Sequence, residues 1–417
     1  MPRKKVDGEP TEKKKKTCDD NFFGELAEAT GGNLLSECGK TKYFVDTGNL
    51  ALNYICSGRF VGGGIPGGKI TEVFGPPASS KSLLANCVLA ATQRMGGIAV
   101  LIDTEHAANA EFARIAAHVD PDKLIHFDEL YSIEQVEKKI VAVAKKVREK
   151  KGPDVPIVFV WDSISTTPTE REFKETELPE NATATQIKEA GGNARPGERA
   201  KAAGDMLRKI NPFLDSNNAT LFIINQIRKN IGDMWNPHTT SGGGMALPFY
   251  ASLRLETDVR KKIEDEKKGV PIGINLVFKN KKNRSTTPFL ETKGVKLYYS
   301  KGIDPISGLL SILIGAGRVE GNKGVFKVLS KWTADGKEYT FRSSQERNDV
   351  PVKVLLENPT LMDAETEQQV RDYLSSYESA TELSNSADTV EKDMVADGES
   401  EEESVIEKLG LEDAVSD

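Results

Sequence analysis

The chain has 417 residues, of which 38% are hydrophobic and 29% charged, a composition typical of a folded, soluble protein of one or two domains. No apolar run approaches the ~20 residues that span a bilayer, and the four cysteines form no CxxC pair. These features argue against membrane contact, structural zinc and disulfides and favour the cytoplasm. The net charge of −7 is uneven: residues 378–417 carry 14 acidic and 2 basic side chains, so the remainder is net positive, which permits a polyanionic partner.

The N-terminal 16 residues form a lysine-rich arm without apolar periodicity. We expect this arm to be disordered, serving either as a solubility or localisation segment or as a nucleic-acid contact. Residues 17–42 contain FFGELAEA, which predicts a short helix in a segment that we interpret as an oligomerisation region.

Residues 43–301 alternate short apolar runs with stretches of helical periodicity. This alternation predicts an α/β core with βαβ units and a mostly parallel, twisted sheet flanked by helices. The polar, glycine-rich segments 176–204 and 228–244 are interpreted as loops, which at this length are usually functional or disordered. Residues 302–377 are predicted to form a small α+β domain, and residues 378–417 a disordered acidic tail. The apolar runs are KITEVF (69–74), IAVLID (98–103), IVFVWD (157–162), TLFIIN (220–225) and INLVF (274–278).

The segment GPPASSKS (75–82) lies between the first apolar run and a helical stretch, which is the setting of a phosphate-binding loop. In such a loop Lys81 reaches the β- and γ-phosphates of ATP, and the Ser82 hydroxyl ligates Mg²⁺. Ser80 replaces the last glycine of GxxxxGK[ST], which weakens the motif because glycine lets the backbone bend freely. The predicted nucleotide contacts here are Gly75, Pro76, Pro77, Ala78, Ser79, Ser80, Lys81, Ser82 and Leu83.

Polar side chains follow three further apolar runs. Asp162 is placed to hold Mg²⁺, and Glu105 to act as the general base that orients the attacking water. An acidic residue after a strand also commonly caps a helix, which is the simpler interpretation of either carboxylate alone. Asn225 and Gln226 end the fourth run, where they are expected to contact the γ-phosphate and report its presence to the loop that follows.

These motifs, in this order, resemble the RecA family of homologous-recombination ATPases over about residues 43–376. The segment IDTEHAANAEFARIAAHVDPDKL (102–124) is similar to the family segment that carries the catalytic glutamate. The most specific string, LFIINQIRKNIGDMWNPHTTSGGGMALPFYASLRLE (221–256), is similar to the family across its glutamine switch and second DNA-binding loop.

The resemblance implies a role for several residues around the nucleotide. Glu105 would be the catalytic base, assisted by Lys81, and Gln226 the switch between nucleotide state and DNA binding. Phe112 and Tyr299 would lie beside the nucleotide. The remaining implied residues are Lys282 and Arg284, which would reach the neighbouring subunit's ATP, with Lys279 and Lys281 as substitutes, and Phe249, which would lie at the subunit interface.

The resemblance also places a first DNA-binding loop within about residues 177–200 and a second within about 227–244. Both would hold single-stranded DNA largely through its backbone. Trp235 could stack on bases, although an ordinary loop aromatic is the simpler interpretation. The predicted DNA contacts are Gly197, Arg199, Lys201, Arg208, Arg228, Lys229, Trp235, Gly243 and Gly244.

The function implied is a DNA-dependent ATPase that forms an ATP-bound helical filament on single-stranded DNA. The filament would pair with homologous double-stranded DNA and exchange strands in recombination and repair, with single-strand-binding and loader proteins as further partners. Two alternatives stay open: a ring-forming helicase or motor on the same core, and a non-hydrolysing mediator or paralogue. The glycine-rich string after Gln226 disfavours the first, and the full set of predicted ATP-site residues disfavours the second.

Three positions depart from the family pattern: Ser80, Asn109, where the family often has Asp, and Pro248, where it often has Lys. The string GIDPISGLL (302–310) resembles phage-encoded relatives. It favours a divergent, phage-encoded member in the host cytoplasm, without deciding between a phage and a cellular origin.

Overall fold

The structure is a computed structural model that describes residues 22–32, 34, 41–129, 132–176, 197–229, 238–240, 244–265, 269–343 and 350–377. The chain divides into two compact units, Met1–Thr41 and Lys42–Asp417. In the first unit the predicted short helix is present as α1 (Phe22–Thr30), and none of its residues is buried. In neither unit is a described helix both long and apolar enough to cross a membrane.

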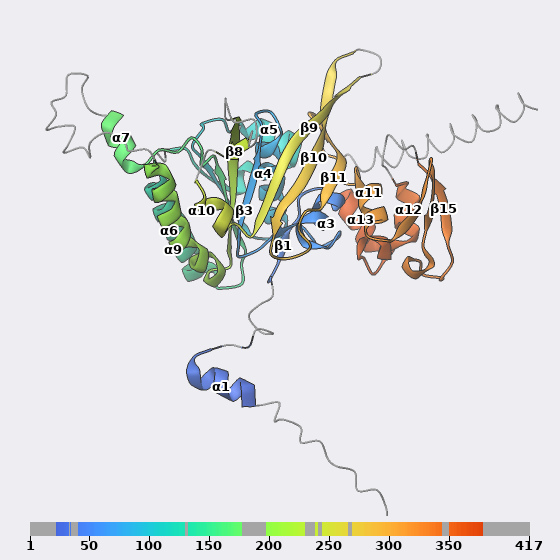
Figure 1. The fold of residues 1–417 in the computed structure, drawn as a ribbon, viewed down its shortest axis with the longest axis horizontal. Coiled ribbons are helices and arrows are strands. Elements are labelled where there is room, and N and C mark those ends of the chain that lie inside the picture. The colour runs from blue at the N-terminus through green and yellow to red at the C-terminus, as the bar shows by residue number, and fades with distance from the viewer. Residues whose placement is uncertain are drawn as a thin grey trace, which may run out of the picture. The chain divides into compact units, whose positions relative to one another are not determined.

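The second unit is organised around one large sheet (Figure 1). Among the described residues it has ten strands, in the order β12-β11-β10-β9-β3-β7-β6-β4-β5, with β8 paired to β7. The pairings from β9 to β5 are parallel, and β8, β10, β11 and β12 pair antiparallel. The strands are β3 (Ile70–Gly75), β4 (Ile98–Asp103), β5 (Leu124–Phe127), β6 (Ile157–Asp162), β7 (Ala219–Lys229), β8 (His238–Thr240), β9 (Leu253–Glu264), β10 (Pro271–Asn283), β11 (Glu291–Tyr298) and β12 (Gly302–Ile303).

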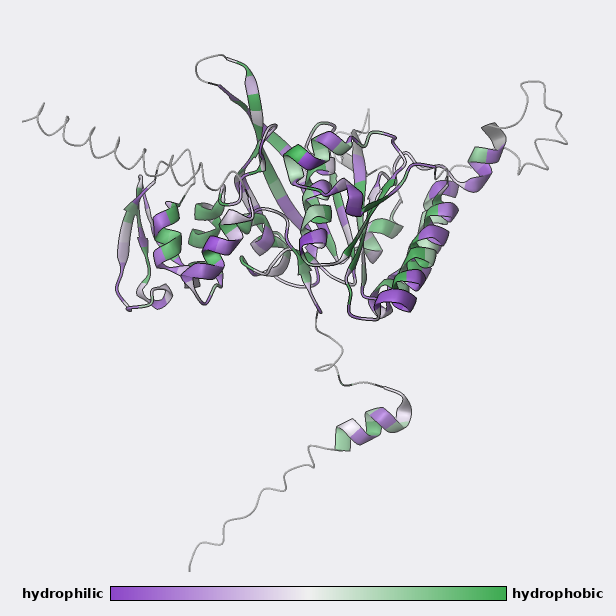
Figure 2. Ribbon diagram, turned by 180° about the vertical axis from the view of Figure 1, so that it is seen from behind, coloured by the Kyte–Doolittle hydropathy of each residue, from purple (hydrophilic) through white to green (hydrophobic). Residues whose placement is uncertain are grey.

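Helices cover both faces of this sheet, which explains why its central strands are apolar at nearly every position. In β6, Val158 and Val160 belong to one buried cluster and Phe159 and Trp161 to the other. Figure 2 shows hydrophilic and hydrophobic residues alternating along the covering helices. Helices α3 (Leu50–Ser57), α4 (Lys81–Arg94) and α5 (Ala110–Ala117) pack on the first face, and α6 (Ile133–Lys151), α9 (Glu198–Ser216) and α10 (Ala246–Tyr250) on the second. The predicted α/β core is confirmed.

Two segments that we interpreted wholly as loops contain regular structure. Helix α7 (Glu170–Thr176) ends where the first segment begins, and α9 starts at Glu198 rather than after Gly204. The loop prediction was wrong for residues 198–204 because Gly204 masks the helical spacing of the buried side chains that follow. A Cβ at Gly204 would lie 3.3 Å from the Ala246 Cβ, so glycine permits a close approach of α9 to α10. In the second segment β7 continues to Lys229 and β8 follows.

The C-terminal part packs against the same core and has the predicted α+β composition. Arg318 joins it to the core: its guanidinium lies 4.2 Å from the Trp332 ring centroid and 4.8 Å from that of Phe60, and it pairs with Asp363 at 2.7 Å. The core sheet itself extends through β12, two residues beyond the predicted boundary. The remaining elements are β1 (Phe44–Val45), β2 (Ile65–Pro66), η1 (Pro121–Lys123), α11 (Leu309–Gly315), β13 (Val319–Asn322), β14 (Val325–Val328), η2 (Ser330–Trp332), β15 (Tyr339–Arg342), α12 (Val352–Glu357), η3 (Pro359–Met362) and α13 (Glu367–Ser375).

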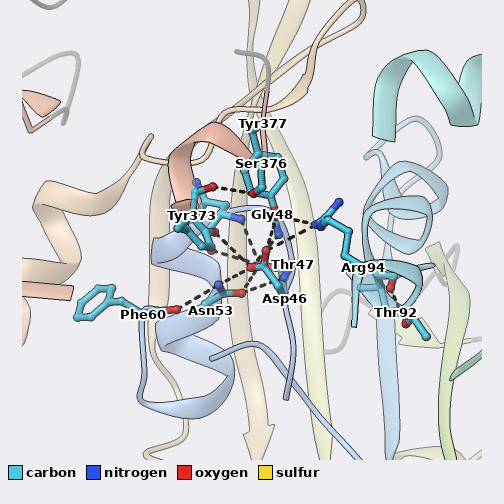
Figure 3. A network of polar contacts seen from close by, with 12 residues as sticks. Asp46, Thr47, Gly48, Asn53, Phe60, Thr92, Arg94, Tyr373, Ser376 and Tyr377 are labelled. Carbon is cyan, nitrogen blue, oxygen red and sulfur yellow. Dashed lines mark hydrogen bonds and ion pairs between the residues drawn. The ribbon is translucent and has the colours of Figure 1, made fainter. Parts of the chain in front are cut away.

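A partly buried polar cluster centred on Asp46 connects the end of α13 to the end of α4 (Figure 3). Asp46 accepts hydrogen bonds from the hydroxyls of Tyr373 and Tyr377 and, at 2.6 Å, from Asn53 Nδ2. Arg94, in the last turn of α4, donates to the Tyr377 hydroxyl at 2.9 Å. Burial, together with the Asp46 charge, raises the pKa of both tyrosines well above the usual range, so both remain hydrogen-bond donors.

Removing the Tyr377 hydroxyl should therefore destabilise the protein, since Asp46 and Arg94 would each lose a buried partner. We expect Tyr377→Phe to lower the free energy of unfolding by about 1–3 kcal/mol, measured by denaturant titration. Tyr339→Phe is the matched control, because the Tyr339 hydroxyl bonds to Asp335 at the surface. Equal small effects of the two substitutions would contradict the role assigned to the cluster.

Candidate nucleotide-binding site

The phosphate loop connects β3 directly to α4. At its start, a Cβ on Gly75 would lie 2.4 Å from the Thr257 carbonyl oxygen, so only glycine fits there. Ser80, which replaces the expected glycine, has φ 58° and ψ 29°, the left-handed conformation that glycine adopts without penalty. The loop thus keeps its expected path, and Ser80 carries a backbone strain of about 1 kcal/mol.

Lys81 folds back over this loop. Its ammonium donates to the carbonyl oxygens of Pro76 at 2.7 Å and Gly75 at 3.3 Å, and to Ser79 Oγ at 3.4 Å. Burial lowers the pKa of Lys81, and the nearby carboxylates of Asp162 and Glu105 oppose that shift. The loop therefore holds a partly desolvated cation where the phosphates of a nucleotide would bind.

Ser82 and Asp162 meet at the start of α4. The Ser82 hydroxyl donates to Asp162 Oδ2 at 2.6 Å, and burial is the main cause that raises the pKa of Asp162 to about 6. Hydroxyl and carboxylate oxygens are ligands that Mg²⁺ prefers, and a desolvated carboxylate gains from pairing with a cation. No group of three or more acidic, His or Cys side chains among the described residues would hold a metal alone. The pair thus fits a cation that arrives with nucleotide phosphates.

Glu105 lies beside Gln226, which brings the predicted base and the predicted switch into contact. Its Oε1 accepts a hydrogen bond from Gln226 Nε2 at 2.9 Å and one from Ser163 Oγ at 2.5 Å. Asp103 shapes the turn by accepting from the backbone N–H groups of Glu105 and Ala108 at 3.2 and 2.8 Å. We did not identify Ser163 or Asp103 from the sequence, although Asp103 is the last residue of β4 and Ser163 follows the last residue of β6.

A cavity of about 370 Å³ adjoins the Ser82–Asp162 pair and extends to Phe112 on α5. The Phe112 ring is 43% exposed and offers a flat apolar surface suited to a base. Asn109 caps α5 by accepting from the Phe112 N–H at 2.8 Å, which gives this departure from the family pattern a local role. Tyr299 is 45% exposed and does not line the cavity.

Lys282, Arg284 and Phe249 form a second group. The Lys282 ammonium donates to the carbonyl oxygens of Pro248 and Phe249, both at 2.8 Å, and Arg284 donates to that of Phe249 at 3.1 Å. The Phe249 side chain is 66% exposed. No hydrogen bond between described residues joins this group to the phosphate loop of the same chain.

Apart from Arg208, the predicted DNA contacts that can be placed lie near the roots of the two loops. Gly197 and Lys201 begin α9, where a Cβ on Gly244 would lie 2.7 Å from the Ala200 Cβ, so the two roots are adjacent. Arg199 pairs with Glu172 at 3.0 Å. Arg208 lies on α9, and Arg228 and Lys229 lie in β7, whereas Trp235 and Gly243 fall outside the described residues.

Comparisons with known proteins identify the family to which the chain is similar. A family model described as the RecA N-terminal domain matches residues 33–304. Protein RecA of Thermus thermophilus is 30% identical over 312 residues, 73% of this chain and 82% of the relative. That of Aquifex aeolicus is 32% identical over 330 residues, 79% and 83% of the two chains, and that of Deinococcus radiodurans 31% over 312 residues, 74% and 77%.

The conformation of Ser80 predicts how substitutions there behave. Ser80→Gly should relieve the left-handed strain and leave stability unchanged or raised by up to about 1 kcal/mol. Ser80→Val should lower stability by about 1–3 kcal/mol, because a branched side chain resists this conformation. Thermal unfolding and binding of a fluorescent ATP analogue would measure both, and equal behaviour of the two variants would contradict the assigned strain.

The raised pKa of Asp162 predicts a pH-dependent gain in stability for Asp162→Asn. In the unfolded chain this carboxyl loses its proton near its ordinary pKa of 3.8, whereas in the folded protein it keeps the proton until about pH 6. The Asp162 carboxylate therefore lowers the free energy of unfolding above pH 6. Below about pH 4 this carboxyl is protonated in both states and no longer affects stability. We expect a gain on the order of 1–2 kcal/mol at pH 8, allowing for partial exposure, that disappears by pH 4.

Thermal unfolding of the nucleotide-free protein with chelator would measure this gain. Asp122→Asn, on the exposed turn η1, is the control. A gain that persisted at pH 4 would show that the charge of Asp162 is not its cause.

Proposed function

The chain belongs to the RecA family and is therefore a recombinase that catalyses DNA strand exchange in recombination and repair, and we propose that ATP turnover at Glu105 drives its cycle on single-stranded DNA. The observation that carries the proposal is the hydrogen bond between Glu105 and Gln226. It connects the candidate base to the strand that leads into the second DNA-binding segment.

In this proposal the phosphate loop binds ATP through its backbone N–H groups and Lys81. Lys81 exchanges its carbonyl partners for the β- and γ-phosphate oxygens. A bound Mg²⁺ would offset phosphate charge, with Ser82 and Asp162 as its protein partners. Phe112 stacks on the base within the adjoining cavity.

Glu105 acts as the general base. Gln226 and Ser163 hold its carboxylate, so Oε1 already has two hydrogen-bond donors. When Gln226 turns its amide to the γ-phosphate, Oε1 becomes available to accept a proton from the attacking water. Turnover is thereby linked to the position of one side chain in β7.

DNA binding follows from the same strand. β7 continues past Gln226 into the segment 227–244, whose end at Gly244 lies against the start of α9. A change at Gln226 therefore reaches the roots of both proposed DNA-binding segments. Contacts with the DNA backbone make binding tolerant of sequence and sensitive to salt.

Subunit contacts complete the site. Lys282 and Arg284 both donate to the Phe249 carbonyl oxygen and, among the described residues, make no hydrogen bond to their own phosphate loop, as expected for groups that face a neighbouring ATP. Such a contact joins two different surfaces, and when repeated without closure it gives a helical filament on DNA. The complete set of phosphate-loop, cation and base residues favours a hydrolysing recombinase over an inactive paralogue.

The test is ATP hydrolysis with and without single-stranded DNA, followed by strand exchange with homologous duplex. Glu105→Gln should lower the DNA-stimulated kcat by about 10²- to 10⁴-fold while ATP-dependent DNA binding persists, because only proton acceptance is removed. Glu111→Gln, on the exposed side of α5, is the matched control. Hydrolysis that survives Glu105→Gln would disprove the base assignment, and wild-type hydrolysis indifferent to DNA, with no exchange, would disprove the proposed function.

A further inference from the structure

A row of four polar and charged side chains crosses the sheet between the nucleotide site and the exposed group at Phe249. The row consists of Asn225, Glu72, Arg254 and Lys282. At its centre is Glu72 in β3, whose side chain is fully buried. Strand β3 lies between β7 on one side and β9 on the other. Glu72 faces the helix side that carries α10, since Ile70, two residues earlier, packs in the cluster that contains Leu247.

The two oxygens of the Glu72 carboxylate serve different strands. Oε1 accepts a hydrogen bond from Asn225 Nδ2 in β7 at 2.9 Å. Oε2 pairs with Arg254 Nε in β9, and the Arg254 guanidinium also lies 4.7 Å from the Phe74 ring centroid. Because Glu72 has two acceptor oxygens, one residue can hold both partners at once.

On the β7 side the row ends at the switch. Asn225 is fully buried, and its Oδ1 accepts a hydrogen bond from the Gln226 backbone N–H at 3.0 Å. Gln226 in turn donates to Glu105. Glu72 thus holds the residue that orients the backbone of Gln226.

On the β9 side the row ends at Lys282. Arg254 and Lys282 are directly paired across β9 and β10. Burial, Arg284 and Arg254 lower the pKa of Lys282, and Glu72 opposes them. Without Glu72 the two neighbouring cations would repel each other, and without Arg254 the Lys282 ammonium would lose the guanidinium beside it. Either change should shift the Lys282 ammonium from its two carbonyl partners on Pro248 and Phe249.

The energetics of such a row argue for a role beyond stability. Burying an ion pair costs solvation free energy that the pair recovers only in part, and apolar replacements are often equally stable. The Glu72–Arg254 pair also connects two groups that act on nucleotides of different subunits in the proposed function.

We propose that Glu72 is a positioning residue for ATP turnover, which aligns Lys282 toward the neighbouring subunit's nucleotide through Arg254 while holding the Gln226 switch of its own subunit through Asn225. The inference rests on the proposed function. It makes the two nucleotide-facing sides of one subunit depend on a single buried carboxylate.

Glu72→Gln alone has one acceptor oxygen for two donors and leaves Arg254 without its counter-charge, so it should lose both stability and turnover. The informative variant is Glu72→Gln with Arg254→Met. It restores an acceptor for Asn225, removes both charges and should unfold near the wild-type temperature. We expect its DNA-stimulated kcat to fall at least about tenfold with the ATP KM within about twofold of wild type. Arg254→Lys, which keeps the charge, should retain more turnover.

The decisive measurement mixes subunits. Glu105→Gln subunits lack the base but keep Glu72, Arg254 and Lys282 intact, whereas the double variant keeps Glu105. In mixed assemblies an intact Lys282 can face an intact Glu105, so hydrolysis should exceed the sum of the two proteins measured separately. Arg318→Met with Asp363→Asn removes another ion pair, in which only the arginine is buried, outside the row, and should lower stability without reducing kcat.

Three outcomes are separable. Full recovery of DNA-stimulated turnover by the double variant would reduce Glu72 to a structural residue and overturn the inference. A hydrolysis rate in mixed assemblies that equals the sum of the two separate rates would overturn the proposal that Lys282 is aligned across subunits. Wild-type protein that shows no DNA-stimulated hydrolysis would instead overturn the proposed function.

Discussion

The hydrogen-bond register of four parallel strands is the constraint on which the site depends. Because β3, β7, β6 and β4 run in the same direction, their carboxyl ends share one edge of the sheet. The register pairs Gly75 with Gln226 and Asp103 with Asp162. Residues that are distant in the chain therefore become neighbours, and a shift of one residue would turn the side chains of the shifted strand to the opposite face.

The charges gathered at this edge depend on one another. Lys81 is desolvated, and its ammonium is stabilised by Asp162 and Glu105. Asp162 is itself disfavoured as a carboxylate by burial and by Glu105, and the Ser82 hydroxyl compensates in part. A bound nucleotide adds both negative phosphates and a cation to this group. Burial of the Lys81 and Asp162 charges thus lowers the stability of the nucleotide-free protein and, for the same reason, favours binding of a nucleotide with its cation.

The phosphate loop is also supported through the far end of helix α4. Helix α4 begins at Lys81, in the candidate phosphate site, and its last turn carries Arg94, which bonds to the Asp46 cluster at the end of α13. Figure 3 shows how residues from the start and the end of the described core meet there. The C-terminal part thereby supports the helix that follows the phosphate loop, while Glu72 bonds to Asn225, next to the proposed switch Gln226, on the opposite face of the sheet.

Local patterns alone were enough to identify the strand–loop–helix at GPPASSKS, the carboxylates at the ends of two strands and the glutamine near the end of a third, because strand ends can be recognised from apolar runs. They did not reveal which strand lies beside which, so the Glu72–Arg254 pair, the contact of Ser163 with Glu105 and the junction of Ala200 with Gly244 came only from the tertiary structure. The start of α9 was mispredicted because Gly204 obscures a helix whose stability depends on packing against α6 and α10. The sequence by itself determined the chemistry of each strand end, since composition and spacing are local. Only the fold decided which of these groups meet, since strand register and burial depend on contacts between distant segments.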